Sequence, residues 1–313
     1  MKRVLAIAAL VSVFASCNNS PKFEKTESGM TYKIFKGDGK EKFKQGDIIK
    51  FDVLVKISPK DTVWFTTYNR LPQYVPFDTA AKNTGDFTEL LKLASIGDSI
   101  VTMMSVDSMV KRNMAQYNDI LKRGDQIVTQ VKLLKVFAKE EDVTKDQKEA
   151  FEKRKVAEVA ELGNYLKSKG IKAEKTENGV FVELKNTGAG PLVTDGKQVT
   201  VDYTGYLIEN GKPFDSNVDS AIGAVRPFSF VVGRDPIIAG WAEGLKKFAE
   251  GSSGTLYIPS SLGYGPRGSA PVIPAFANLK FDVLVKKIAD APPAPSTPAG
   301  MPNQEANGQN APK

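Results

Sequence analysis

The feature that most constrains the fold is an internal repeat. The string "EKTESG" occupies Glu24–Gly29, and "EKTENG" occupies Glu174–Gly179, 150 residues later in a chain of 313. At the same offset, "GDIIKFDV" (46–53) aligns with "GKQVTVDY" (196–203). At an offset of 154, "FTELLKLASIGDS" aligns with "WAEGLKKFAEGSS". A repeat of this length predicts one fold used twice, and each copy is long enough to bury its own core.

The composition excludes several kinds of catalytic and metal site. The chain has no histidine, so it cannot form a Ser-His-Asp or Cys-His catalytic arrangement or a histidine-ligated metal site. It has one cysteine, which excludes an intrachain disulfide and a thiolate zinc site. We therefore expect no metal and no other cofactor.

The net charge of +7 raises the question of nucleic acid as a partner. The lysines are interspersed with acidic residues, as in "KEEDVTKDQKEAFEKRK" (139–155), and form no single basic run. This pattern favours a solvated surface over nucleic-acid binding.

The N-terminus has the pattern of a bacterial export signal. Lys2 and Arg3 precede the apolar run "VLAIAALVSVFAS", which is too short to span a bilayer. The small residues Ala15 and Ser16 then precede Cys17. The string "FASC" resembles the bacterial lipobox, which implies cleavage before Cys17 and lipid attachment to it. The alternative is an ordinary signal peptide followed by an unrelated cysteine.

On the lipobox interpretation, residues 1–16 are a signal peptide and residues 17–22 are a tether to the membrane. Asn18 follows Cys17, at the position where an inner-membrane retention signal usually shows aspartate. By analogy, we expect the protein in the bacterial cell envelope, anchored by lipid to the outer membrane and facing the periplasm.

The repeat divides the remaining chain into two domains joined by a helix. In the first domain (23–138), we expect strands at 47–57 and 126–137 and a short helix at 87–97 stopped by Gly97. Residues 139–170 form a predicted helical linker that ends at Gly170. Its apolar residues recur at helical spacing: Phe151, Val156, Val159, Ala160, Leu162 and Leu166. We expect this stripe to rest on the linker's own domain rather than on a second copy of the chain.

The second domain (171–288) has the pattern of antiparallel strands around one short helix, an α+β arrangement. Val199, Val201 and Tyr203 share one face of a strand, and Asn210–Gly211 predicts a two-residue hairpin turn. The helix is expected at Trp241, Leu245 and Phe248. Residues 289–313, rich in Pro, Ala, Asn and Gln, are predicted to be a disordered tail.

The successive strings of the second domain carry a family resemblance. In order, "VDYTGYL", "PFDSN", "PFSFVVG", "PIIAGWAEGL", "GYGPRG" and "VIPAFANLKFDVLV" are similar to the motifs of FKBP-type peptidyl-prolyl isomerases over about residues 180–288. The resemblance implies a half-open antiparallel sheet curled around a short helix in each copy, with a pocket for a prolyl ring in the second.

The family also implies a role for each matching residue. Trp241 would be the floor of the pocket, and its walls would be Tyr203, Phe214, Phe228 and Phe281. Asp215 and the Tyr264 hydroxyl would be the polar groups near the prolyl amide. Ile237 and Ile238 would line the pocket mouth, with the Ile238 N–H available to a substrate carbonyl, and Val272 and Ile273 would lie on an overhanging loop.

This resemblance implies peptidyl-prolyl cis-trans isomerisation, with proline-containing unfolded or exported polypeptides as substrates. The reaction needs no nucleophile, because an apolar pocket that favours the twisted amide over the planar one lowers the rotational barrier. The alternative function is a non-catalytic chaperone or adhesion lipoprotein that binds polypeptides through FKBP-like modules.

The second domain also departs from the family pattern. The segment between Asp215 and Phe228 is longer than in short family members, which leaves Arg226 as one candidate for a basic partner of Asp215. Ser269 stands where many relatives carry histidine in the overhanging loop.

The first domain (23–138) is predicted to be a degenerate copy. The offsets place Val53, Phe87 and Val110 at the positions of Tyr203, Trp241 and Tyr264. The string "PFDT" (76–79) copies "PFDS" in an uncertain register, and "MVKRNMAQYNDIL" (109–121) has a helical, methionine-rich pattern. Scaffolding, polypeptide binding through flexible methionines and homodimerisation remain alternatives for its role.

Overall fold

The computed structural model describes residues 22–80 and 84–293. The chain divides into two compact units between residues 154 and 155, and we describe each unit by itself. The predicted signal peptide, Cys17, most of the tether and the tail beyond residue 293 lie outside the described residues.

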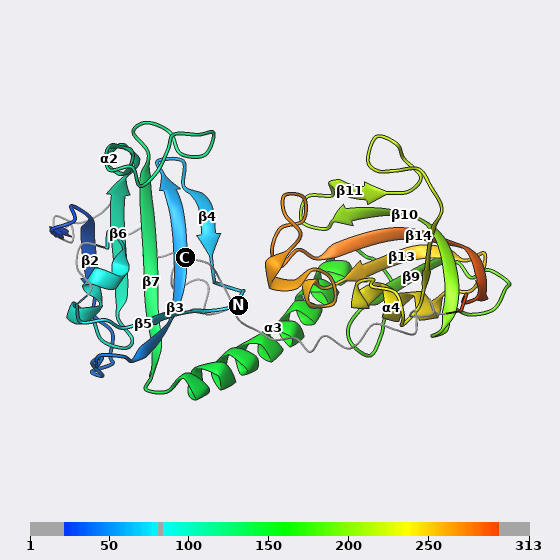
Figure 1. Ribbon diagram of the computed structural model, residues 1–313, viewed down its shortest axis with the longest axis horizontal. Helices are drawn as coiled ribbons and strands as arrows, with labels where there is room; N and C mark the ends of the chain where they lie inside the picture. The colour runs from blue at the N-terminus through cyan, green and yellow to red at the C-terminus, as the bar shows by residue number, and fades with distance from the viewer. Residues whose placement is uncertain (1–21, 81–83, 294–313) are drawn as a thin grey trace, which may run out of the picture. The chain divides into compact units, whose positions relative to one another are not determined.

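Unit 1 is built on one antiparallel sheet of seven strands (Figure 1). The strand order is β1-β2-β6-β7-β3-β4, and β5 pairs with the other half of β3. The strands are β1 (Glu24–Lys25), β2 (Thr31–Phe35), β3 (Ile48–Ser58), β4 (Thr62–Thr66), β5 (Gln73–Pro76), β6 (Ser99–Ser105) and β7 (Gln126–Phe137). Its helices are the 3-10 helix η2 (Phe87–Leu93) and α2 (Val106–Lys111).

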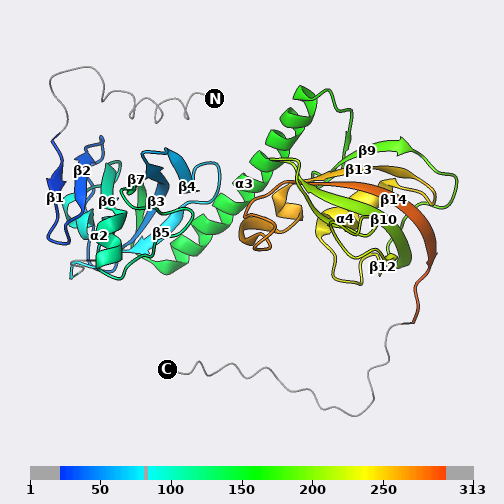
Figure 2. The ribbon, with the colours of Figure 1, turned by 90° about the horizontal axis from the view of Figure 1, so that it is seen from above.

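Unit 2 repeats this topology (Figure 2). Its strand order is β8-β9-β13-β14-β10-β11, and β12 pairs with β10 as β5 pairs with β3. The strands are β8 (Glu174–Lys175), β9 (Phe181–Asn186), β10 (Lys197–Leu207), β11 (Pro213–Ser216), β12 (Phe228–Val231), β13 (Ser253–Ile258) and β14 (Leu279–Asp290). The helices are α4 (Ala239–Gly244), η3 (Leu245–Lys247), η4 (Ser260–Leu262) and η5 (Gly265–Arg267). The predicted α+β class, with one fold used twice, is confirmed.

The repeated string forms the same β-hairpin in both units. The Thr26 N–H donates to the Met30 carbonyl at 2.9 Å, and the Thr176 N–H donates to the Val180 carbonyl at 2.8 Å. The glycine that ends each string has positive φ, +81° at Gly29 and +108° at Gly179. Glycine tolerates this conformation best, which explains why the string ends with it.

Each unit has its own apolar core beneath the sheet. In unit 2, Leu245, Phe248 and Leu256 are fully buried. In unit 1, the corresponding cluster includes Leu91 and Leu133. Burial of this kind is the main stabilising term of each unit.

The helix predicted over 139–169 is α3 (Glu140–Ser168), which begins in unit 1 and ends in unit 2. In unit 2, Leu162 and Leu166 pack against Phe181 and Tyr257 in a buried cluster. Gly170, at φ +70°, ends the helix as predicted. Val156 does not belong to the packed stripe, since its side chain is 73% exposed. No helix among residues 22–80 and 84–293 is long and apolar enough to cross a membrane.

Four local predictions need correction. The helix expected at 87–97 is a 3-10 helix that ends at Leu93, since the chain is already extended at Ala94. The helix expected over 109–121 ends at Lys111, because Asn113 adopts φ +57°. The turn at Asn210–Gly211 belongs to a longer loop, residues 208–212, and is not a two-residue hairpin turn. Strand β14 continues to Asp290, two residues into the predicted tail. This end of β14 remains paired with β10, and the side chains of the facing residues Asp290 and Lys197 form a 2.5 Å ion pair.

The separate cores predict separate unfolding transitions. Leu245→Ala should destabilise unit 2 by about 2–5 kcal/mol, because the side chain is fully buried and leaves a cavity. Unit 1 and unit 2 each contain one of the two tryptophans, Trp64 and Trp241. In a Trp64→Phe background, denaturant unfolding followed by fluorescence should therefore report unit 2 alone. The matched variant Leu91→Ala should leave that midpoint unchanged, and an equal shift would show that the units unfold together.

Candidate active site

The site is organised around one indole in the short helix α4. Trp241 is 4% exposed and points into the core of unit 2. The helix lies close to the sheet because Gly240 has no side chain, and a Cβ there would collide with Ile258 on β13. Within the described residues, the buried Trp241 Nε1–H has no hydrogen-bond partner. The indole is therefore held by packing.

Aromatic rings surround this indole edge-on. The ring centroids of Tyr203 and Phe281 each lie 5.1 Å from that of Trp241, both with interplanar angles of 89°. Phe228 lies 5.8 Å away at 79°. Phe214 packs at 5.5 Å against Phe281. Such T-shaped pairs are favourable beyond simple area burial, and these five residues form what we call the aromatic bowl.

The bowl depends on a glycine in β10. A Cβ at Gly205 would lie 2.7 Å from ring atoms of both Phe214 and Phe281. Real Cβ atoms do not approach ring carbons this closely, so any other residue would displace one of the two rings. The register of the sheet pairs Gly205 with Phe281 on β14 and with Asp215 on β11. Gly205 thus leaves the room in which these two rings pack against each other.

The polar group of the bowl is the Asp215 carboxylate. Tyr203 Oη donates to Asp215 Oδ2 at 2.6 Å. Burial, and then this hydrogen bond to Asp215, raise the pKa of Tyr203 above its ordinary value. The Tyr203 hydroxyl therefore stays protonated across the neutral range and holds Asp215 in place.

Asn217 positions Tyr203 and is a residue that the sequence analysis missed. Its Oδ1 accepts from the Tyr203 N–H at 2.6 Å, and its Nδ2 donates to the Val201 and Arg226 carbonyls at 2.8 and 3.1 Å. The asparagine lies inside the quoted string "PFDSN". Its side chain is buried, and each end of its amide is hydrogen-bonded. This burial marks Asn217 as a positioning residue, and the sequence alone does not reveal it.

Tyr264 and Ile238 offer hydrogen-bond donors at the rim. The Tyr264 side chain is 39% exposed, and burial, then the charge of Asp215, raise the pKa of its hydroxyl. A protonated tyrosine can donate to an acceptor on a bound molecule. Ile238 is the N-cap residue of α4, and its N–H has no acceptor within the described residues. Ile237 packs against the same core cluster.

The overhanging loop places one of its two predicted residues toward the site. Ile273 is 6% exposed and belongs to the core cluster with Trp241, whereas Val272 is 51% exposed. The loop is closed on itself, since Ser269 and Ile273 exchange two backbone hydrogen bonds of 2.8 Å. Ser269 therefore helps to close the loop through its backbone N–H and carbonyl groups.

Two further residues near the bowl differ from expectation. Arg226 makes no ion pair with Asp215 among the described residues, and its side chain is exposed. Phe230, for which the sequence analysis gives no role in the site, is 3% exposed and packs at 5.7 Å against the Trp241 ring. It supports the indole from the core side.

Unit 1 lacks the bowl, and the strand register shows why. The bulge between Lys50 and Phe51 in β3 matches that between Thr200 and Val201 in β10, which fixes the alignment. The residue facing Val55 on β7 is Thr129, where unit 2 has Phe281 facing Gly205. The remaining exchanges are Val53 for Tyr203, Phe65 for Asp215, Gln73 for Phe228, Phe87 for Trp241 and Val110 for Tyr264.

The string "PFDT" does not correspond to "PFDS". Pro76 pairs with Ile48 as Val231 pairs with Gln198, so the string continues β5 at the position where unit 2 has the end of β12. The strand of unit 1 that matches β11 is β4, with Trp64 and Phe65 exposed. The similarity of the two strings is therefore a coincidence of sequence.

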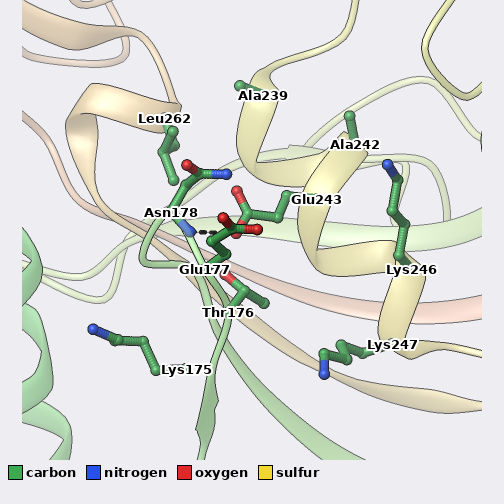
Figure 3. Close-up of a pocket in the computed structure, with 10 residues that line it drawn as sticks. All are labelled: Lys175, Thr176, Glu177, Asn178, Ala239, Ala242, Glu243, Lys246, Lys247 and Leu262. Atoms are coloured by element: carbon green, nitrogen blue, oxygen red, sulfur yellow. Dashed lines mark hydrogen bonds between the residues drawn. The ribbon is translucent and has the colours of Figure 1, made fainter.

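A separate cavity of about 560 Å³ lies on the outer side of α4 (Figure 3). The turn between β8 and β9 forms one wall, and the Asn178 N–H donates to Glu243 across it at 2.8 Å. Lys175, Lys246 and Lys247 also line it. In the described residues, no group of acidic or cysteine side chains is arranged to hold a metal ion.

Known proteins match the part of the chain that holds the bowl. The family described as FKBP-type peptidyl-prolyl cis-trans isomerase matches residues 190–286. The FK506-binding protein of Neisseria meningitidis serogroup B is 40% identical over 110 residues, 35% of this chain and 96% of that protein. The FKBP-type isomerase FkpA of Escherichia coli is 37% identical over 134 residues, 43% of this chain and 46% of that protein.

One solved structure joins these matches. The crystal structure of FkpA from Escherichia coli is 31% identical, with a TM-score of 0.38, and the match covers 49% of this chain and 69% of that one. The relative from Neisseria is matched over nearly its whole length. The chain belongs to the family of FKBP-type peptidyl-prolyl cis-trans isomerases.

Proposed function

We propose that the aromatic bowl of unit 2 binds the prolyl ring of a polypeptide and catalyses cis–trans isomerisation of the preceding bond. The observation that carries this assignment is the set of rings around Trp241, together with two donors that have no acceptor within the described residues, the Tyr264 hydroxyl and the Ile238 N–H. Unit 1 has the same fold without this arrangement, so we assign the activity to unit 2 alone.

The chemistry follows from the nature of the barrier. Resonance gives the prolyl bond partial double-bond character and a rotational barrier of about 18–20 kcal/mol. The planar amide is charge-separated, whereas the twisted amide at the top of the barrier is less polar. An apolar bowl therefore favours the twisted form, which is differential binding of the transition state.

Each residue has a defined part in this scheme. Trp241 supports the ring, and Tyr203, Phe214, Phe228 and Phe281 exclude water from it. Ile238 N–H and Tyr264 Oη orient the substrate by donating to its carbonyl groups. Asp215, fixed by Tyr203, lies beside the prolyl amide, and Ile237 and Ile273 contact the chain at the mouth. No proton is transferred and no covalent bond forms.

We also propose that lipid on Cys17 holds the protein in the bacterial cell envelope, where it assists folding of exported chains. The support is the N-terminal pattern of charged, apolar and small residues before a single cysteine. Slow prolyl isomerisation limits the folding of many proteins, so an anchored isomerase would act where exported chains fold.

The first prediction from the proposed function tests the bowl. Trp241→Ala in the full chain should lower kcat/KM for a proline-containing peptide by at least about tenfold, because the support of the prolyl ring is lost. The matched control is Phe87→Ala, the equivalent residue of unit 1, which should leave activity unchanged. Circular dichroism confirms that each variant is folded. Substantial activity in folded Trp241→Ala protein would contradict the assignment to unit 2.

The second prediction concerns pH. The chain has no histidine, and the pKa values of Tyr203 and Tyr264 are raised above the ordinary value of 10.0. Raised tyrosine pKa values mean that both hydroxyls stay protonated as pH increases and lose their protons only above about pH 10. We therefore expect kcat/KM to be flat between about pH 6 and 9. A step inside that window would reveal an ionising group absent from this scheme.

The third prediction concerns the anchor. Cys17→Ala expressed in a bacterial host should move the protein from the membrane fraction to the soluble fraction, because no acceptor for lipid remains. Blocking lipoprotein signal peptidase with a globomycin-type inhibitor should leave the unprocessed form of the unaltered protein. Membrane association that persists in Cys17→Ala would rule out the lipid anchor.

A further inference from the structure

Helix α3 sends one carboxylate into the interior of unit 2. Glu158 is 2% exposed, although it belongs to a helix whose sequence is dominated by charged residues. It lies outside residues 190–286, the part that matches the isomerase family. Burying a carboxylate is costly unless hydrogen bonds compensate for lost water, so its partners identify what it does.

The two oxygens of Glu158 bind the start of one loop. Oε1 accepts from Ser260 Oγ at 2.7 Å, and Oε2 accepts from the Ser261 N–H at 3.1 Å. Ser260 is 1% exposed, and its own N–H donates to Asn278 Oδ1 at 3.0 Å. The side chain and backbone of Ser260 are thus held from different directions, by α3 and by the segment before β14.

This loop leads directly to Tyr264. Ser260–Leu262 form η4, the Gly263 N–H donates back to the Ser260 carbonyl at 2.9 Å, and Tyr264 follows as the N-cap residue of η5. Tyr264 Oη has no acceptor within the described residues, so the backbone on either side fixes the direction of the ring. The Ser260–Gly263 turn holds it on one side, and the Gly268 N–H, which donates to the Tyr264 carbonyl at 3.2 Å, holds it on the other. A displacement of Ser260 would therefore be passed to the tyrosine ring.

Packing of the part of α3 that belongs to unit 2 fixes the position of the Glu158 carboxylate. Val159, Leu162 and Leu166 belong to the apolar cluster with Phe181 and Tyr257. The β8–β9 turn fits against this helix because Gly179 has no side chain, and a Cβ there would collide with Val159. The helix is thus packed against the β8–β9 hairpin directly after Glu158.

Unit 1 provides an internal comparison. The residue equivalent to Ser260 is Val106, which is fully buried and begins helix α2, and the residue equivalent to Tyr264 is Val110. The unit that lacks the tyrosine also lacks the hydroxyl that Glu158 binds in unit 2. The serine and the tyrosine are therefore present together or absent together in the two copies.

We propose that Glu158 is a positioning residue for Tyr264, so that the C-terminal half of α3 is part of the catalytic unit. Glu158 acts through the Ser260–Gly263 backbone and does not touch the substrate. The inference rests on the proposed role of the Tyr264 hydroxyl. It also places the N-terminal limit of the catalytic unit before Glu158, not at residue 171.

The test uses the full chain and a proline-containing peptide. Glu158→Ala should lower kcat/KM roughly three- to tenfold, because the misplaced Tyr264 hydroxyl would no longer donate its hydrogen bond to the substrate. Glu158→Gln should keep most activity, since its amide can still accept from the Ser261 N–H and donate to Ser260 Oγ. The matched control is Glu149→Ala, which removes an exposed carboxylate of α3 and should change nothing.

A double-mutant cycle shows whether Glu158 acts through Tyr264. Tyr264→Phe should cause a loss similar to that of Glu158→Ala, and Glu158→Ala should add little to it in the combined variant. Losses that multiply, or a Glu158→Ala variant as active as the unaltered protein, would overturn the proposal. A general loss of stability caused by Glu158→Ala would lower activity by the same factor with Tyr264 or Phe at position 264. It would thus be distinguished from an effect that acts through the Tyr264 hydroxyl.

A second measurement does not depend on activity. Hydrogen exchange of the Ser261 amide should be faster in Glu158→Ala than in the unaltered protein, and the NMR resonances of the Tyr264 ring should shift. Glu158→Gln should restore both. If the unaltered chain shows no isomerase activity, the proposed function fails, and these two signals still decide whether Glu158 positions Tyr264. Unchanged exchange and unchanged ring resonances would refute the positioning role.

Discussion

The site depends on the contact that Gly205 allows between β10 and the rings beside it. Phe214 and Phe281 come from strands on opposite sides of β10, and both reach the volume that a Cβ at Gly205 would occupy. With that volume free, Phe281 can stand at 89° to the indole of Trp241 and close one wall of the bowl. The absence of a side chain at Gly205 is thus one requirement for the arrangement of rings in unit 2.

Unit 1 shows what the same sheet does without this space. Val55 takes the place of Gly205, and Thr129 takes the place of Phe281. The bulge, strand order and short helix under the sheet are all kept. The fold therefore does not require the bowl, because unit 1 buries a core around residues such as Leu91 without it. In unit 2, Trp241 and Phe281 belong both to the bowl and to the buried core cluster, so binding and stability share these positions.

The sequence predicted what local patterns and spacing encode. Alternating apolar and polar residues predicted strands with alternating burial, such as β10. The constant offset between the two copies predicted that one fold is used twice. Contacts between distant segments were missed: Glu158 lies 102 residues from Ser260, and a glutamate in a charged helix gives no sign of burial. The helix expected over 109–121 failed because Asp107 binds the Tyr117 hydroxyl and the Gly124 N–H, which favours a folded loop over further helical turns.

A reaction without proton transfer places unusual weight on such distant contacts. Here the groups at the rim are neutral hydrogen-bond donors, whose effect depends on their distance and direction. The pKa of Tyr264 is raised, so its hydroxyl stays protonated in the neutral range, and its contribution there depends on where it points. Residues that fix backbone geometry are therefore important for the reaction although they do not touch the substrate. These residues are Asn217, which binds the Tyr203 backbone, and Glu158, which binds the loop before Tyr264.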